Sequence, residues 1–228
     1  MSASPRIAPP DWLLLQLADS AFPTGSFAHS GGLEAAWQHQ EVRNRDHLIE
    51  FVEAALNQLA QGTIPFVRGS FEEAEKFTDL DEHFDAFTTN HVANRASRAQ
   101  GRAFLTTTDR AFGLAASRDL RMLVEDRKLP AHFATVFGHL LQALGFDQIS
   151  TARLFLFNHL RGLISSAVRL NIVGPLDGQA LQARLAPYAE SILVPSLKIE
   201  IEHAAQTAPL LDLFQSTQDR LYSRLFQS

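Results

Sequence analysis

The fold of this chain is decided by Ser150–Ile172, which reads STARLFLFNHLRGLISSAVRLNI. Apolar residues recur along one side of this stretch at helical spacing, and leucine and phenylalanine also occupy its other sides. A helix that is apolar almost all round must be buried on more than one side, because each apolar side is stabilised by leaving water. The stretch therefore predicts a long helix at the centre of a bundle or in an interface between subunits.

Helical spacing continues on both sides of this stretch. Leu and Ala together number 63 residues against 18 for Val and Ile, which favours helices over strands. No strand–helix alternation, fixed repeat or long linker interrupts the pattern. We therefore expect an all-α fold, a single-domain helical bundle over residues 1–228. The further helices expected are Asp46–Gly62 with Asp46 as N-cap and Gly62 as its stop, Phe71–Phe87 either whole or broken near Asp79–Asp81, Asn90–Thr107, Asp109–Glu125, His132–Leu144 closed by Gly145, and Asp177–Ala189.

The two ends of the chain differ from the bundle in composition. Residues 1–10 contain three prolines and no apolar run, which predicts a flexible N-terminal arm and no secretory signal. Residues 215–228 finish with tyrosine, arginine and phenylalanine, a composition typical of an interface segment that becomes ordered on binding. A helical turn packed on the chain's own core is the other interpretation of this tail.

Composition excludes several classes of protein. The chain has no cysteine, which removes disulfide scaffolds, thiolate zinc sites, iron–sulfur clusters and cysteine nucleophiles together. Its net charge of −5 and pI of about 6.0 argue against a general nucleic-acid binder. The longest uncharged stretch, Leu129–Phe146, contains two histidines and a proline and so predicts a buried helix instead of a membrane span. A cytoplasmic protein is expected.

An unusual loop, Asp19–Glu34, lies between two helical patterns and contains three glycines, three serines and a proline. One interpretation is a helix–loop–helix connection, in which Pro23 ends the first helix and Ser30 caps a helix that starts near Gly31. The other is a loop whose backbone approaches something closely, either a partner or an anion at the helix N-terminus.

The sequence contains no clear motif for a catalytic site, a metal site or a phosphate-binding site. Ser30 follows His29 in a pattern similar to the nucleophile elbow of serine hydrolases, but Ala28 stands where that pattern requires glycine. The nine histidines are scattered, and Glu200-Ile-Glu202-His203 is more typical of a solvated face than of a metal site. No glycine-rich phosphate motif occurs. We therefore predict no catalytic residue, no metal and no cofactor, and keep a serine esterase using Ser30 only as a minor alternative.

Three arginines share one face of an expected helix, because Arg95, Arg98 and Arg102 lie at positions i, i+3 and i+7. A solvated or salt-bridged face is one interpretation. A docking surface for an acidic partner is the other, and it would make the chain a homodimeric helical adaptor for some acidic client.

Two segments at opposite ends of the chain are similar to the signatures of one known family. They are FPTGSFAHSGGLE at Phe22–Glu34 and YSRLFQS at Tyr222–Ser228, and the internal stretches Ala96–Gly101 and Arg169–Leu176 are similar as well. On these residues the chain resembles the urease accessory protein UreF family. It departs from the family before the tail, where Gln218-Asp219 replaces a frequent His-Glu.

The resemblance implies a non-enzymatic, all-α homodimer that assists the insertion of nickel into the urease apoprotein. Proteins of this family join UreD, called UreH in some systems. They also recruit and modulate the nickel-carrying GTPase UreG, which hydrolyses the GTP. The resemblance implies no nucleic-acid partner and no membrane partner.

Roles for individual positions are also implied by the resemblance. The tail that binds UreD or UreH would comprise Tyr222, Ser223, Arg224, Leu225 and Phe226. The signature loop near the UreG-docking surface would comprise Pro23, Gly25, Phe27, His29, Ser30, Gly32 and Glu34. The dimer seam would include Arg153 and Phe157 on the long helix, in agreement with the apolar character of all its sides.

Overall fold

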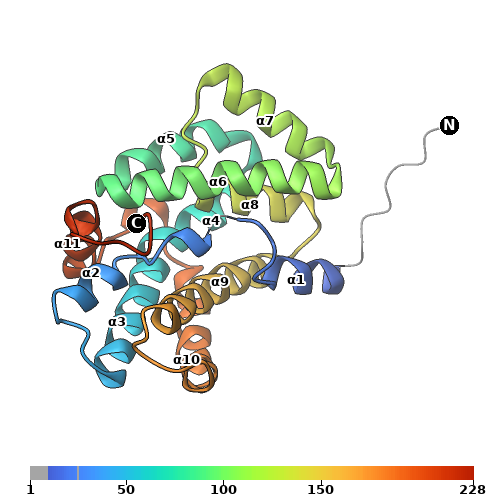
Figure 1. Cartoon of the computed structure of the whole chain (residues 1–228). Helices are drawn as coiled ribbons and strands as arrows, with labels where there is room; N and C mark the ends of the chain where they lie inside the picture. Colours follow the sequence, from blue (N-terminus) through green and yellow to red (C-terminus); the bar gives the residue numbers. More distant parts are fainter. Residues whose placement is uncertain (1–9, 25) are drawn as a thin grey trace.

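The computed structural model describes residues 10–24 and 26–228, and within these ranges the chain is helical without any β-strand (Figure 1). This confirms the predicted all-α fold. Pro10 begins the first helix, and the rest of the predicted N-terminal arm lies outside the described residues. The α-helices are α1 (Pro10–Ala18), α2 (Leu33–Gln38), α3 (Arg45–Gln58), α4 (Ile64–Glu72), α5 (Phe77–Phe87), α6 (His91–Phe112), α7 (Ala115–Arg127), α8 (Phe133–Ala143), α9 (Gln148–Arg169), α10 (Pro175–Ser196) and α11 (Pro209–Thr217).

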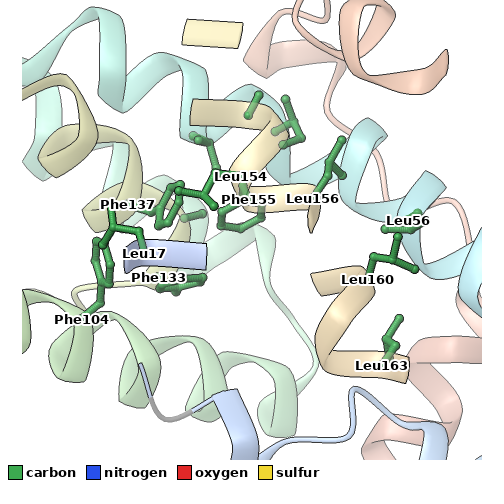
Figure 2. Close-up of a cluster of buried hydrophobic side chains, with 14 of the residues drawn as sticks. Leu17, Leu56, Phe104, Phe133, Phe137, Leu154, Phe155, Leu156, Leu160 and Leu163 are labelled. Carbon is green, nitrogen blue, oxygen red and sulfur yellow. The ribbon is translucent and has the colours of Figure 1, made fainter. Parts of the chain in front are cut away.

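Helix α9 is the centre of the bundle, as its sequence predicts. It packs against α1, α2, α3, α4, α8 and α10, and ten of its residues are buried. Figure 2 shows Leu154, Phe155, Leu156, Leu160 and Leu163 pointing from α9 into the surrounding helices. Burial on several sides is thus achieved within one chain, and the apolar character of α9 is explained without a second subunit.

A cluster of phenylalanines joins α6, α8 and α9. Phe104, Phe133, Phe137 and Phe155 are all buried, and neighbouring rings lie with centroids 5.2–5.6 Å apart (Figure 2). Edge-on and tilted pairs dominate, which is the arrangement that aromatic quadrupoles favour. This cluster fixes α6 against the central helix, and α6 carries side chains of both surfaces described below.

Two glycines allow helices to approach α8 and the turn before it closely. A Cβ atom on Gly101 of α6 would lie 2.0 Å from the carbonyl oxygen of Ala131, and one on Gly138 of α8 would lie 2.1 Å from that of Val67. No side chain fits at either distance, so glycine is required at both positions. Gly101 ends the Ala96–Gly101 stretch, which therefore has a packing role.

The predicted helix Asp46–Gly62 is wrong at both of its ends. Asn44 is the N-cap, and its side-chain oxygen accepts from the main-chain N–H groups of Asp46 and His47 at 3.0 Å. Gly62 does not stop the helix, because Leu59–Thr63 forms a π-helical turn that continues into α4. Gly62 is instead needed for packing, since a Cβ there would lie 2.9 Å from the Ala205 carbonyl oxygen.

Other helix ends also differ from the prediction, and each difference has a local cause. Helix α6 runs on to Phe112 and is closed by Gly113 in the left-handed conformation, with φ of +63°. The break before α5 falls at Ala74–Lys76, ahead of Asp79. Helix α10 continues past Ala189 because Leu193 is fully buried and anchors its last turns. The predictions for His132–Leu144 and Ser150–Ile172 are confirmed by α8 and α9.

The predicted ends of the helices on either side of the signature loop differ from those in the structure. Helix α1 ends at Ala18, before Pro23, because the Asp19 carboxylate accepts from the main-chain N–H of Ala21 and forms a turn. Helix α2 begins at Leu33, later than expected, with Gly32 as its N-cap. In the described part of the chain, none of the helices combines the length and the apolar character that crossing a bilayer requires.

Candidate functional site: the junction between the signature loop and the tail

The signature loop and the C-terminal tail lie against each other, although nearly the whole chain separates them in sequence. The main-chain N–H of Gln227 donates to the Ala28 carbonyl oxygen at 2.8 Å. The main-chain N–H of Ser30 donates to the main-chain oxygen of Ser228 at 2.5 Å. We call the contact of residues 26–34 with residues 218–228 the loop–tail junction. The sequence suggested two separate surfaces, and the structure brings them together.

Glu34 is the central acceptor of the loop–tail junction. Its side chain lies in the first turn of α2, and the residue is only 2% exposed. The carboxylate accepts from the main-chain N–H groups of Leu225 at 2.6 Å and Phe226 at 3.1 Å. It also accepts from Nε2 of Gln218 at 2.6 Å. A buried carboxylate is stable only with such a set of donors, so Glu34 fixes the path of the tail.

Arg169, the last residue of α9, supplies the cation of the junction. Its guanidinium lies 3.7 Å from the ring centroid of Phe27 and 4.1 Å from that of Phe226. It also donates to the Phe27 carbonyl oxygen. Burial lowers the pKa of Arg169, and the nearby charge of Glu34 acts in the opposite direction. A cation between two rings connects loop, tail and central helix in one unit.

His29 adds a polar contact to the same junction. Its Nδ1 lies 2.5 Å from the hydroxyl oxygen of Ser228. Burial, with a smaller contribution from the positive charge of Arg95, lowers the pKa of His29 to about 4. The imidazole is therefore neutral near pH 7, and one of its nitrogens is free to accept a hydrogen bond.

Stability of the junction is expected to depend on pH through His29. The unfolded chain binds the proton below about 6.5, whereas folded His29 binds it only near 4, so the free energy of unfolding should fall as pH drops between these values. The total loss is at most roughly 3 kcal/mol. Thermal unfolding of the wild type and of His29→Gln from pH 7.5 to pH 4 measures it, because the variant should show a shallower decline. Equal slopes in the two proteins would contradict this assignment, since His159 contributes equally to both.

Glycines bring the loop close to α11. Gly31 and Gly32 have φ values of +62° and +88°, which side chains adopt only under strain. A Cβ on Gly32 would also lie 3.1 Å from the main-chain nitrogen of Gln215. The backbone of the loop does make a close approach, but to the chain's own C-terminal region and not to the partner or anion that this interpretation named. Gly25 lies outside the described residues.

The remaining loop positions have local roles. Ser30 is 1% exposed, and its hydroxyl oxygen accepts from the main-chain N–H of Glu34 at 3.4 Å. The prediction that Ser30 caps the helix is wrong, because α2 begins at Leu33 and Gly32 is its N-cap. Among the described residues, no histidine forms a hydrogen bond with the Ser30 hydroxyl. The geometry does not support the esterase alternative. Pro23 is exposed, and its carbonyl oxygen accepts from the Thr107 hydroxyl at 3.0 Å.

The tail is buried on one side and open on the other. Phe226 and Ser228 are 3% and 1% exposed, whereas Tyr222 is fully exposed and Leu225 is half-exposed. The Ser223 carbonyl oxygen accepts from the Gln38 side chain at 2.9 Å. The tail therefore packs on the chain's own core through Glu34 and Arg169, as its second interpretation expected, but residues 221–228 do so without forming a helical turn.

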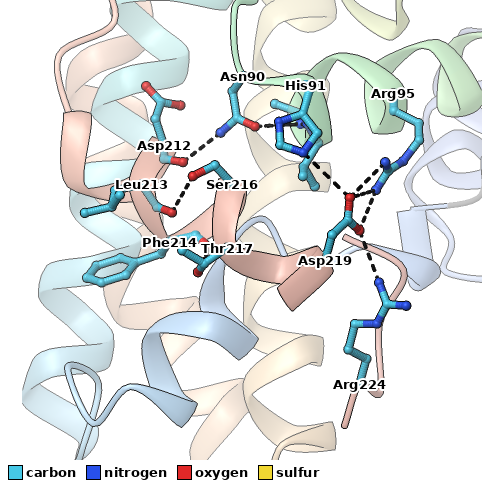
Figure 3. A network of polar contacts seen from close by, with 12 residues as sticks. Asn90, His91, Arg95, Asp212, Leu213, Phe214, Ser216, Thr217, Asp219 and Arg224 are labelled. Carbon is cyan, nitrogen blue, oxygen red and sulfur yellow. Dashed lines mark hydrogen bonds and ion pairs between the residues drawn. The ribbon is translucent and has the colours of Figure 1, made fainter. Parts of the chain in front are cut away.

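An ion-pair network extends from the tail onto α6 (Figure 3). Asp219 accepts two parallel hydrogen bonds from Arg95, at 2.9 and 3.0 Å, and pairs with Arg224 at 3.1 Å. The hydrogen bonds and charge of Arg95 hold the pKa of Asp219 below its usual range, and the charges of Arg224 and His91 make smaller contributions in the same direction. The predicted arginine face is thus salt-bridged at Arg95, while Arg102 donates to the Leu129 carbonyl oxygen at 2.9 Å.

The two residues expected in a dimer seam have partners within the chain. Arg153 pairs with Glu190 of α10 at 2.7 Å, and both side chains are about half exposed. Phe157 is half-buried and lies 5.8 Å beneath the guanidinium of Arg161. The first contact joins α9 to α10 and the second lies within α9, and the dimer seam stays a prediction.

Glu200-Ile-Glu202-His203 contains a short 3-10 turn after α10 and is held by an ion pair. Glu200 pairs with Arg68 at 2.8 Å, which accounts for its position. Within residues 10–24 and 26–228, no group of three or more histidine and acidic side chains is arranged to hold a metal ion.

A cavity of about 230 Å³ lies behind the loop, between it and α9. Burial lowers the pKa of His159, one of its lining residues, to about 4. Like His29, which also lines the cavity, His159 is neutral near pH 7. The cavity therefore presents two uncharged imidazoles beside the carboxamide of Asn158, whose buried oxygen has no hydrogen-bond partner in the described chain.

Comparison with known proteins fits this geometry. The model of the UreF family matches residues 42–186, which is more than half of the chain. The chain belongs to the UreF family. Urease accessory protein F of Oryza sativa subsp. indica is 38% identical over 219 residues, covering 94% of this chain and 84% of the rice protein. The Arabidopsis thaliana protein of the same name is 37% identical over 223 residues, covering 95% of this chain and 92% of the plant protein.

A bacterial member of the UreF family is more distant but covers the same length. Urease accessory protein UreF of Kocuria rhizophila is 27% identical over 226 residues, covering 94% of this chain and 95% of its own. The family model covers Arg169 but neither the signature loop nor the tail, whereas the pairwise matches extend over nearly the whole chain.

Three residues of the junction were missed as site residues from the sequence alone. Arg169 begins a stretch that is similar to the family, and this likeness was the only signal for it. Gln218 stood out only as a departure from the family pattern, although it is fully buried against Glu34. Ser228 belongs to the tail segment that is similar to the family, but its own chemistry gave no further signal.

Proposed function

We propose that this chain is a non-enzymatic scaffold for urease maturation, which binds UreD or UreH and recruits and modulates the GTPase UreG. The relatives supply the class, since they are named urease accessory proteins. The observation that carries the finer proposal is the loop–tail junction, which holds both signature segments in one rigid arrangement. The junction therefore accounts for the presence of both signature segments in one chain through their contact with each other.

The tail is proposed to bind UreD or UreH through its open side. Tyr222 and Leu225 are apolar or aromatic, exposed and held by a backbone that Glu34 fixes in place. A fixed backbone lowers the entropy lost on binding, and exposed tyrosine and leucine side chains supply apolar area. Phe226, in contrast, acts from inside by positioning the segment.

The loop is proposed to contribute to the surface that recruits UreG. Phe27 is 68% exposed although Arg169 holds its ring in place. Because the loop and the tail share Glu34 and Arg169, binding on the tail side acts directly on the loop. This arrangement gives the scaffold a physical means of coupling two partners.

Nickel is proposed to pass this protein as cargo on its way to the urease apoprotein. Neutral imidazoles are suitable ligands for divalent nickel, and His29 and His159 supply two of them at the cavity. Asp212 also lines the cavity, but these side chains form no group of three arranged to hold a metal ion within the described residues, which favours transient contact over tight storage. Homodimerisation near Arg153 and Phe157 and a cytoplasmic location belong to the same proposal.

Co-purification with tagged UreD or UreH from the same organism tests this function, with masses determined by light scattering. Full-length protein should form the complex, and a chain truncated after Leu221 should not. Truncation removes buried Phe226, so folding of the truncated chain is checked by circular dichroism. The double variant Tyr222→Ser, Leu225→Ser removes only exposed parts of the tail and should weaken binding at least about tenfold.

Leu176→Ser is the matched control, because Leu176 is 88% exposed on α10, outside the junction. It should bind UreD or UreH as the wild type does. Absence of binding by the full-length chain would overturn the proposed function. Binding by the double variant at wild-type strength would move the partner site away from the tail. The same light-scattering masses report whether the free chain is a dimer.

A further inference from the structure

A groove beside α6 has a charge balance opposite to that of the chain as a whole. Its walls include Arg95, Arg98 and Arg102 on one helix face, together with His91, Asn94 and Asp85. The chain carries a net charge of −5, so a concentration of arginines in one groove is not explained by overall composition. The groove lies outside the contacts between Glu34 and the tail.

The carboxylates in and beside the groove are already engaged by groups of the chain itself. Asp85 accepts from the Asn94 side chain at 2.9 Å and from the His132 imidazole at 2.9 Å. Asp219 accepts from Arg95 and Arg224, as Figure 3 shows. Hydrogen bonds from Asn94 and His132 hold the pKa of Asp85 below its usual range against the effect of burial, so it stays ionised.

Arg98 is the third cation of the groove, and its charge makes a smaller contribution to the lowered pKa of Asp85. It is exposed, and within the described residues it makes neither a hydrogen bond nor an ion pair. Its neighbours one turn to either side, Arg95 and Arg102, each have a partner of their own. Five guanidinium donors in a planar fork therefore stand free in a positive groove, the arrangement that fits a carboxylate bidentately.

We propose that this groove docks an acidic segment of a partner protein, with a carboxylate of that segment on Arg98. The proposal rests on the proposed function, because the partner is taken to be a member of the same maturation assembly. A protein segment fits better than a nucleic acid, since Asp85 lines the groove, Asp219 lies beside it on Arg95, and the chain's net negative charge repels a long polyanion.

The groove is continuous with the tail through one residue. Asp219 bonds Arg95 at the groove and Arg224 in the tail, and both bonds are visible in Figure 3. A partner seated on the exposed tail residues can therefore extend along α6 to Arg98 without leaving the surface. Arg95 is a positioning residue here, because its charge is shared with Asp219.

Charge reversal at Arg98 is the first test. The probes are UreD or UreH, UreG and urease apoprotein from the same organism, each measured separately by biolayer interferometry at about 50 mM and about 300 mM salt. Arg98→Glu should weaken one of the three at least about tenfold at low salt and less at high salt. Arg98→Lys keeps the charge but loses the planar fork, so it should bind more tightly than Arg98→Glu and more weakly than the wild type.

Arg118→Glu is the matched control, since Arg118 is exposed on α7 and the variant changes the net charge equally. It should leave every affinity within about twofold. Equal effects of the two charge reversals, or no effect of either, would overturn the groove proposal while leaving the proposed function standing. If the wild type binds none of the three probes, the proposed function fails and the groove proposal fails with it.

Crosslinking identifies the docked segment. The chain contains no cysteine, so Ala99→Cys places a single thiol in the groove for a benzophenone maleimide. Photolysis with the probe that Arg98→Glu weakens should yield a crosslink within a stretch rich in aspartate and glutamate. Ala180→Cys on α10, also exposed, is the control and should not give that crosslink. A crosslink from Ala99→Cys to a basic or apolar stretch would contradict the proposal.

Discussion

Replacing Glu34 with glutamine is expected to detach the tail from the loop. The carboxylate accepts from Leu225 N–H, Phe226 N–H and the Gln218 side chain, and it is almost completely buried. Glutamine keeps the shape but turns one acceptor into a donor, which then faces a donor. Charge-assisted hydrogen bonds are lost and a buried N–H is left unpaired, so the free energy of unfolding should fall by roughly 2–4 kcal/mol.

Urea denaturation of the wild type and Glu34→Gln measures this loss, with Glu41→Gln as the control. Glu41 is exposed close to the end of α2, and its replacement should change stability by less than about 0.5 kcal/mol. Hydrogen exchange locates the effect, since the amides of Leu225 and Phe226 should lose protection before those of α9. Retained protection at both amides would show that another group holds the tail.

The central helix could be predicted because its signal is local. Every side of Ser150–Ile172 carries apolar residues, and periodicity alone requires that such a helix be surrounded. The prediction that Gly62 ends a helix was wrong because it depended on a single residue type. Glycine permits a turn but does not impose one, and here its missing side chain serves the close approach of Ala205.

The junction could not be predicted because its contacts are between distant parts of the sequence. Glu34 looks like an ordinary acidic residue in the first turn of a helix, where it would favour the helix dipole. Nothing in its neighbourhood indicates that its acceptors face amides 191 and 192 positions away. The tail likewise has the composition of a partner-binding segment, and composition does not distinguish a surface on another protein from one on its own core.

The resemblance supplied what periodicity could not. It marked the loop and the tail as important, and the comparisons confirm the family. It assigned the two segments to different partners, and it did not indicate that they contact each other. Two segments that are assigned to different partners can still contact each other. Here one buried carboxylate, Glu34, and one arginine, Arg169, connect the loop to the tail.

Replacing Phe226 with alanine should be the most destabilising single change in the tail. Its ring is one of two that enclose Arg169, and the residue is 3% exposed. Removing a buried phenylalanine leaves a cavity and costs about 3–5 kcal/mol in the free energy of unfolding. Thermal and urea unfolding of Phe226→Ala measure this, and tail-dependent binding of UreD or UreH should be lost together with the stability.

Phe27→Ala is the matched comparison, because Phe27 lies on the other face of the same guanidinium but is 68% exposed. Its loss removes one cation–π contact and little burial, so it should cost only about 1 kcal/mol. A large difference between the two variants would mean that the tail is held by burial of Phe226, with Arg169 orienting it. Equal and small losses would mean that the polar bonds to Glu34 hold the tail by themselves, and that Phe226 is available for a partner to bind.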